Sequence, residues 1–323
     1  MGRRILLTGM GGELGTRVTG LLEDDPTIEA IAGIDLDPPR GRIPRAEFHR
    51  VDPSDRARTV ATVRELEPTA VLHLGVYEPG ARISAREAPL VSELAALAAL
   101  GAAAQCPSLD RIVVRSGIEV YGRPRRGPHK PDESVTPDPT TPWGRALVQV
   151  EQTAIDAAQA ADVPLSILRF APVVGPHIPS PLGRILRLPA VPVSAVADPP
   201  FSLLHQDDAA AAAIRALDAG LDVTANVVGP GAVTPFQAAR MGNRIPVPTI
   251  GPGWAAARLA CSAVGAPLPP HVIELLRRGR GADGALGQDA LGLDPVRGTE
   301  EVVRDLYEWA EVVHLDVADR EAA

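Results

Sequence analysis

The feature that most constrains the fold lies in the first sixteen residues, where an apolar run leads into three evenly spaced glycines. The run covers residues 4–8, the glycines occupy positions 9, 12 and 15, and apolar residues recur at helical spacing after them. This order is typical of a strand, a tight turn and a helix. Glycines there allow a sharp turn and let a diphosphate approach the backbone, and the N–H groups that start the helix attract an anion. The motif therefore predicts a dinucleotide site in an α/β fold.

A second apolar run, residues 28–34, ends in Asp35, roughly twenty residues beyond the glycines, where a ribose-binding acid is expected. A carboxylate at this position accepts hydrogen bonds from the adenosine ribose and repels a 2′-phosphate. Arg40 and Arg42 follow in a loop containing Pro and Gly, and guanidinium groups there could offset the repulsion by contacting phosphate. We therefore expect NAD(P)H, with Asp35 favouring NAD(H) and dual use left open.

The alternation of strand and helix patterns continues to about residue 170, which indicates a parallel sheet covered by helices. Strands are expected at 46–51, 70–76, 111–117 and 165–170, and helices at 57–67, 89–105 and 143–160. A long loop at 123–142 follows a strand end, where substrate sites are commonly shaped. Prolines dominate 171–200, a helix at 209–219 and a strand at 225–229 follow, and 231–310 reads as helices and loops.

Composition limits the classes of molecule that this chain is expected to bind. The net charge of −8 comes from acidic and basic residues mixed along the chain, so no basic patch suits a nucleic acid. No segment approaches the ~18 apolar residues of a membrane span, and the first strand starts too early for a signal peptide, so the cytoplasm is expected. Cys106 and Cys261 lie far apart without other ligands at metal-binding spacing, which predicts buried thiols and no metal. The expected partner is a small-molecule substrate, and the oligomeric state stays open.

Five stretches together resemble the extended short-chain dehydrogenase/reductase superfamily, and within it the NAD-dependent epimerase/dehydratase family. They are residues 8–15, Asp35, residues 116–122, residues 169–172 and residues 205–208. The resemblance covers essentially the whole chain. It implies an α/β fold, a Rossmann-type doubly wound parallel sheet with a smaller, mostly helical C-terminal substrate lobe. The dinucleotide domain would cover 1–170, with the sheet completed by 201–229, and the lobe would comprise 171–200 and 230–323.

The glycine motif, the strand ends and this resemblance together predict a set of cofactor-binding residues. The set is Gly9, Met10, Gly12, Glu13, Leu14, Gly15, Asp35, Leu36, Arg40, Asp52, Pro53, Leu74, Gly75, Val76, Arg115, Phe170, Ala171 and Pro172. Within it, Asp52 is placed to present its carboxylate to the adenine amino group.

The chain departs from the family at the catalytic positions. The family's Ser or Thr, three residues before the Val of Val-Tyr-Gly, aligns with Gly117, its catalytic Tyr with Trp143, and its Lys with Leu147. These changes remove a titratable phenol, the ammonium that lowers its pKa, and a hydroxyl that orients the carbonyl. An indole N–H donates hydrogen bonds but does not titrate near neutral pH. We therefore expect the rate of ordinary sugar-epimerase catalysis to be strongly reduced.

Two interpretations follow. The first is a reductase without the usual acid, because the chain looks most like the triad-lacking angucyclinone ketoreductases of the simocyclinone type, which act on aromatic polyketides in antibiotic biosynthesis. Bulky Trp143 and Leu147 then favour a large apolar polycyclic ketone, whose own neighbouring hydroxyl would assist protonation. The second is a non-catalytic NAD(P)-binding sensor or scaffold. A nucleotide-sugar epimerase or dehydratase comes third.

Three residues are candidates for catalysis. Ser116 precedes Gly117, where the family's Ser or Thr is missing, and Tyr77, beyond the fourth strand, has a route to the nicotinamide side. Glu119 aligns with a carboxylate used by the family's sugar dehydratases. Ser116 is equally compatible with a structural strand-end hydroxyl, and Glu119 with an Arg-paired or solvated carboxylate. Tyr121 is predicted to pack as a signature aromatic. His205, with the two acids after it, is predicted to hold the lobe to the sheet.

Overall fold

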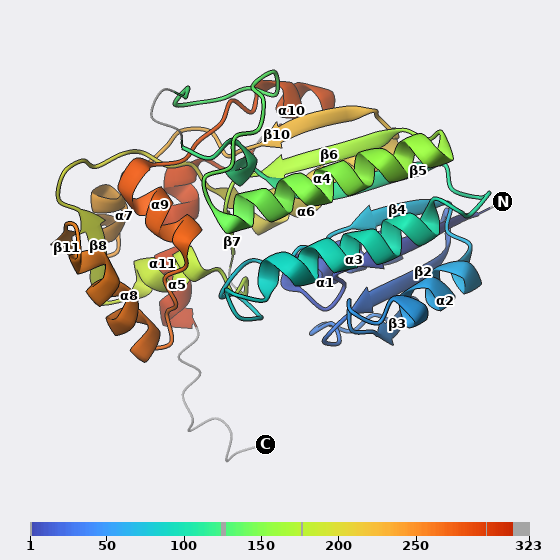
Figure 1. Ribbon diagram of the computed structural model, residues 1–323, viewed down its shortest axis with the longest axis horizontal. Helices are drawn as coiled ribbons and strands as arrows, with labels where there is room; N and C mark the ends of the chain where they lie inside the picture. Colours follow the sequence, from blue (N-terminus) through green and yellow to red (C-terminus); the bar gives the residue numbers. More distant parts are fainter. Residues whose placement is uncertain (1, 124–126, 176, 295, 313–323) are drawn as a thin grey trace, which may run out of the picture.

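The computed structural model describes residues 2–123, 127–175, 177–294 and 296–312 (Figure 1). Its centre is a seven-stranded parallel sheet in the order β10-β6-β5-β4-β1-β2-β3. These strands are β1 (Arg3–Thr8), β2 (Ile28–Asp35), β3 (Glu47–Arg50), β4 (Ala70–His73), β5 (Arg111–Gly117), β6 (Leu165–Phe170) and β10 (Val223–Val227). The order reverses direction between β1 and β4, the switch point at which doubly wound sheets bind ligands. The predicted doubly wound parallel sheet is confirmed.

Helices cover both faces of the sheet. On one face α2 (Arg56–Leu66), α3 (Ala88–Ala103) and α4 (Pro142–Ala161) pack side by side, and on the other α1 (Glu13–Glu23) packs against α6 (Gln206–Ala219) (Figure 1). The strands read as continuous apolar runs because both faces are buried. Ala at many positions of α3 and α4 lets these two helices approach closely. A short 3₁₀ helix, Ile118–Tyr121, continues directly from β5.

A smaller unit with its own apolar core lies beyond the carboxyl ends of the strands (Figure 1). It contains α5 (Pro181–Arg187), β8 (Ala190–Ser194), α7 (Pro235–Met241), β11 (Ile245–Thr249), α8 (Gly253–Ala263), α9 (Pro270–Arg278) and α11 (Thr299–Val312). The chain enters it near β7 (Val173–Val174), which pairs with β9 (Leu204–His205), while α10 (Ala285–Ala290) packs on β10. That this unit binds the substrate stays a prediction.

The sequence reading missed two strands of this unit. β8 and β11 pair in parallel register, although β8 lies in the proline-rich stretch and β11 in a segment expected to hold only helices and loops. Pro192, Pro246 and Pro248 interrupt the usual strand signal. A two-stranded ladder tolerates these prolines because each strand has one unpaired edge, where a missing N–H costs nothing.

Both cysteines, Cys106 and Cys261, are buried and unpaired, as predicted. Over the described ranges, no helix combines the length and the apolar character that crossing a membrane requires.

Candidate active site

Three positions between β1 and the first turn of α1 require glycine: Gly9, Gly15 and Gly11, where a Cβ would lie 1.7 Å from the carbonyl oxygen of Asp37. Gly9 has φ +76°, and a Cβ there would lie 2.7 Å from the backbone of Leu74; a Cβ at Gly15 would lie 2.0 Å from the carbonyl oxygen of Gly9. Helix α1 then begins at Glu13 with Gly12 as N-cap, and no side chain caps it. Its first N–H groups are therefore available to an anion, which is the arrangement that a dinucleotide diphosphate needs.

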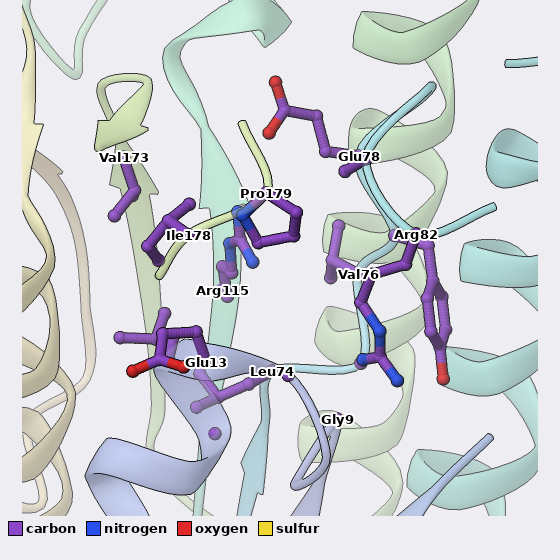
Figure 2. A pocket seen from close by; sticks show the side chains of 16 residues that line it. Gly9, Glu13, Leu74, Val76, Glu78, Arg82, Arg115, Val173, Ile178 and Pro179 are labelled. Carbon is purple, nitrogen blue, oxygen red and sulfur yellow. The ribbon is translucent and has the colours of Figure 1, made fainter. Parts of the chain in front are cut away.

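A cleft opens from this turn across the carboxyl ends of β1, β4 and β5 (Figure 2). Nine of the predicted cofactor residues line it: Gly9, Gly12, Glu13, Leu14, Gly15, Leu74, Gly75, Val76 and Arg115. A smaller adjoining cavity is lined by Phe170, Ala171 and Pro172 together with Arg115. The sequence thus brought most of its predicted set to one place, and contact of these residues with the cofactor stays a prediction.

Six members of the set line neither cavity: Met10, Asp35, Leu36, Arg40, Asp52 and Pro53. Met10 is fully buried beneath Gly33. Asp52 accepts hydrogen bonds from the backbone N–H and the hydroxyl of Ser54, at 2.8 and 2.6 Å. Those bonds stabilise the ionised form and lower the pKa of Asp52. Its Oδ1 is thus bound within the turn that follows β3, and the residue is exposed.

Asp35 ends β2 as predicted, but its carboxylate is covered. It accepts hydrogen bonds from the Leu36 N–H at 2.7 Å, from the Tyr77 hydroxyl at 3.0 Å, and from both terminal nitrogens of Arg82 at 2.8 and 3.1 Å. Arg82 also pairs with Asp37. The Tyr77 hydroxyl therefore points to Asp35, which differs from the predicted route to the nicotinamide side. Burial and the neighbouring carboxylate raise the pKa of Tyr77, so this phenol is a poor proton donor.

The vacant position at Gly117 is filled by a neighbour's side chain. A Cβ at 117 would lie 2.5 Å from Oε2 of Glu119 and 3.2 Å from Cδ1 of Leu147. Glu119 is buried, so its carboxylate stands in the space that the family's Ser or Thr would enter. Trp143 and Leu147, in the first turns of α4, are also buried and line the smaller cavity with Glu119. The three triad substitutions are thus adjacent in space.

Ser116 belongs to a buried polar network that holds α4 to the sheet. Its hydroxyl donates to Glu151 at 2.6 Å, and Glu151 forms a two-pronged ion pair with Arg169 at 2.9 and 2.7 Å. Arg169 in turn donates to the Tyr121 hydroxyl, which donates to Asn226. The Ser116 hydroxyl is thus bound to a buried carboxylate, which fits the structural alternative weighed from the sequence; a catalytic role for Ser116 stays a prediction.

Three charged or titratable residues that sequence reasoning did not assign to catalysis meet where the two cavities join. Glu78, after β4, and Arg115, in β5, line both cavities. His271 of α9 is buried, contacts Oε1 of Glu78 through Nε2 at 3.2 Å, and has its ring 6.3 Å from that of Trp143. Figure 2 shows Arg115 extending into the cleft beside Ile178 and Pro179. No sequence signal links His271 to Glu78, which lies 193 residues earlier.

The electrostatics of this junction centre on Arg115. Burial lowers the pKa of its guanidinium, and the carboxylates of Glu78 and Glu119 oppose that shift. In the described part of the chain the Arg115 side chain is partly exposed to the cavities and makes no side-chain hydrogen bond, and Nδ1 of His271 is buried without a partner. A buried polar atom without a partner, such as this Nδ1, is costly unless a ligand or water satisfies it. The junction is therefore prepared to receive a polar group.

The His205 segment joins three elements away from this junction. Nδ1 of His205 accepts the Asp207 N–H, and Asp207 pairs with Arg17 of α1 at 2.5 Å and with Arg297 at 2.9 Å. The backbone N–H of Arg297 donates to Asp208. This segment therefore ties the start of α6 to α1 and to the chain that leads into α11.

Sequence comparison matches most of the chain to one family. A model of the NAD dependent epimerase/dehydratase family matches residues 5–229, which contain the central sheet except for the first two residues of β1. An uncharacterized protein of Mycobacterium tuberculosis H37Rv is 31% identical over 317 residues, covering 94% of this chain and 83% of that protein. An uncharacterized protein of Mycobacterium bovis shows the same identity and coverage.

Solved structures share the fold at low identity. UDP-glucose 4-epimerase of Thermotoga maritima, with UDP-glucose, has a TM-score of 0.72 at 18% identity, covering 95% of this chain and 98% of that one. UDP-glucuronic acid 4-epimerase of Bacillus cereus, in complex with UDP-glucuronic acid and NAD, has a TM-score of 0.74 at 16% identity, covering 96% and 99%.

Proposed function

Since the chain belongs to the NAD dependent epimerase/dehydratase family and has NAD as its cofactor, we propose that it is a cytoplasmic NAD(H)-dependent ketoreductase. In this proposal the proton does not come from a tyrosine. The dinucleotide would lie along the cleft that starts at the glycine turn, with its reacting end near Arg115, Pro172 and Val173. When bound, NADH supplies the hydride that reduces the carbonyl carbon.

The placement of the three tyrosines carries the proposal. The Tyr77 hydroxyl is bound to Asp35, that of Tyr121 to Asn226 and Arg169, and that of Tyr307 donates to the carbonyl of Ala238 at 2.7 Å. All three phenols of the chain are thus engaged away from Trp143, where the family keeps its catalytic tyrosine. A reductase built on this site needs another proton source.

Glu78 and Arg115 fit the two remaining tasks. Arg115 offers unpaired N–H donors at the cavity junction, which suits the negative charge that develops on a carbonyl oxygen during hydride transfer. Glu78, held by His271, lies at the same junction, and in this proposal its carboxylate takes up a proton from solvent, passes it to that oxygen, and is a carboxylate again when the product leaves. The carbonyl carbon gains the hydride, the oxygen gains the proton, and the cofactor leaves oxidised.

The substrate class follows from the walls of the smaller cavity. Trp143, Leu147, Phe170 and Val173 contribute apolar side chains to its lining beside the charged groups, which supports the predicted ketone on an apolar, polycyclic frame. The cavity encloses about 20 Å³, the room of about one water molecule. A polycycle would therefore extend into the larger cleft and present only its ketone to Arg115. Nucleotide-sugar epimerisation stays a lower-ranked candidate because Trp143 cannot exchange a proton with a sugar hydroxyl.

The test measures NADH consumption with a panel of polycyclic ketones, with and without a hydroxyl beside the ketone, and with UDP-glucose. We expect turnover on a ketone, and a loss of about 10²-fold or more in kcat in Glu78→Gln, as for a removed proton donor. Tyr77→Phe should lose less than about threefold in kcat, because its phenol serves Asp35. Glu65→Gln, at an exposed position of α2, is the matched control.

Two results would contradict the proposal. If kcat fell by about 10²-fold or more in Tyr77→Phe and stayed unchanged in Glu78→Gln, the proton donor would be a tyrosine. Binding of NADH without turnover on any ketone would favour the non-catalytic sensor.

A further inference from the structure

The ribose carboxylate of this chain is bound by its own neighbours, with three hydrogen bonds to Oδ1 and one, from Arg82, to Oδ2. Asp35 takes four hydrogen bonds, from Leu36, Tyr77 and twice from Arg82, and its side chain is 0% exposed. An ionised carboxylate offers about four lone-pair sites. Its charge is also balanced, because Arg82 meets it with both terminal nitrogens. The repulsion that such an acid normally exerts on a 2′-phosphate is therefore reduced, with Asp37 sharing the same guanidinium.

Arg82 stands between the acidic residues and the cofactor cleft. Its Nη1 lies 3.3 Å from where a Cβ of Gly12 would be, and the residue lines the cleft. Figure 2 shows its side chain reaching down toward the loops at Gly9 and Leu74. Three of the five N–H donors of this guanidinium are bonded to Asp35 and Asp37, so the donors left on Nε and Nη1 remain for an anion over the glycine turn.

The charges around this end of the cleft add to the effect. Asp35 and Asp37 are both paired to Arg82, and three further cations lie nearby in sequence and space. Arg50 donates through Nε to the carbonyl oxygen of Leu36, while Arg40 and Arg42 are exposed in the loop after β2. These arginines add positive charge to the loops at the end of β2, where Asp52, exposed after β3, is a further acid.

From this geometry we propose that Arg82 selects the cofactor: it masks Asp35 and provides a cation for a 2′-phosphate, so that the protein binds NADP(H) as well as NAD(H). The proposal rests on the same dinucleotide cleft as the proposed function. The sequence-based expectation assigned this role to Arg40 and Arg42, in the loop after β2. Here the cation that neutralises Asp35 is Arg82, which lies in the loop between β4 and α3.

The test is calorimetric titration with NADH and with NADPH at low and at moderate salt, without any ketone. For the unchanged protein we expect the two affinities to agree within about fivefold, which is about 1 kcal/mol. In Arg82→Ala, NADPH binding should weaken by about tenfold or more because Asp35 becomes an unmasked negative charge. NADH binding should change by less than about threefold, since the freed carboxylate can accept ribose hydroxyls.

Arg86→Ala is the matched control, because Arg86 is an exposed arginine of the same loop. Arg82→Gln keeps hydrogen-bond donors for Asp35 while removing the charge, so it reports on selection even if Arg82→Ala disturbs the loop. Added salt should weaken NADPH binding more than NADH binding, because the extra phosphate of NADPH is bound by electrostatic attraction, which salt screens.

The results separate the two proposals. Binding of NADH but not NADPH by the unchanged protein, or an equal loss of both in Arg82→Gln, would overturn the role of Arg82 in selection. Binding of both cofactors without ketone turnover would overturn the ketoreductase and leave this inference standing. Failure to bind either dinucleotide would overturn both.

Discussion

His73 makes the stability of the glycine turn depend on pH. It ends β4 beside β1, is fully buried, and its Nδ1 lies 2.8 Å from the Thr8 hydroxyl. Thr8 also accepts the Gly75 N–H at 3.1 Å, so its one proton is directed to His73. Nε2 of the ring is buried without a partner in the described part of the chain. The folded protein therefore requires the neutral ring, and burial lowers the pKa of His73 from 6.5 to about 4.

The sign and size of the effect follow from these two pKa values. Above pH 6.5 the ring is neutral in the folded and the unfolded chain, so this contribution to stability is fully present. Between pH 6.5 and about 4 only the unfolded chain takes up the proton, and the free energy of unfolding falls as the pH falls. A tenfold difference in proton affinity is about 1.4 kcal/mol, so the full loss is about 3 kcal/mol.

The assay is urea denaturation from pH 8 to pH 4.5, a range within which we expect most of that loss. His73→Asn keeps an acceptor for Thr8 but cannot titrate, so the slope of unfolding free energy against pH should flatten by most of about 3 kcal/mol. Carboxylates titrate in both proteins and cancel in the difference. His49→Asn, on the edge strand β3, should keep the original slope. The reasoning is refuted if His73→Asn retains the slope of the unchanged protein.

Three further predictions concern the site. Gly117→Ala should lower the free energy of unfolding by about 1–3 kcal/mol, because its Cβ would meet the buried Glu119 carboxylate. In a Glu119→Ala background this loss should be smaller. Equal losses in the two denaturation series would contradict the packing explanation. Arg169→Met should cost about 3–5 kcal/mol by leaving Glu151 charged and unpaired, whereas also changing Glu151 to Leu should recover most of it; a double variant no more stable than the single one would refute this. Gly12→Val should abolish dinucleotide binding in calorimetry with little change in thermal unfolding, and unchanged affinity would move the site elsewhere.

Some parts of this protein follow from local sequence. The order of strands and helices, the turn at Gly9 and Gly15, and the start of α4 at Pro142, where the Thr141 hydroxyl accepts the Gly144 N–H, depend on residues a few positions apart. Apolar runs between glycines suffice to predict parallel strands, because a strand buried on both faces needs no polar alternation. The missing catalytic triad was also visible, since the family pattern fixes those positions relative to one another in the chain.

The chemistry of the site was decided by contacts between residues distant in sequence. Arg82 reaches Asp35 across 47 positions and His271 reaches Glu78 across 193; both contacts depend on how the β4–α3 loop and the smaller unit settle against the sheet. Hydrogen bonds of this kind produce no periodic pattern or fixed spacing in the sequence. They depend on where the two residues lie in space and not on their separation along the chain. The sequence therefore determined that Asp35 ends β2, and only the tertiary structure determined that Arg82 covers it.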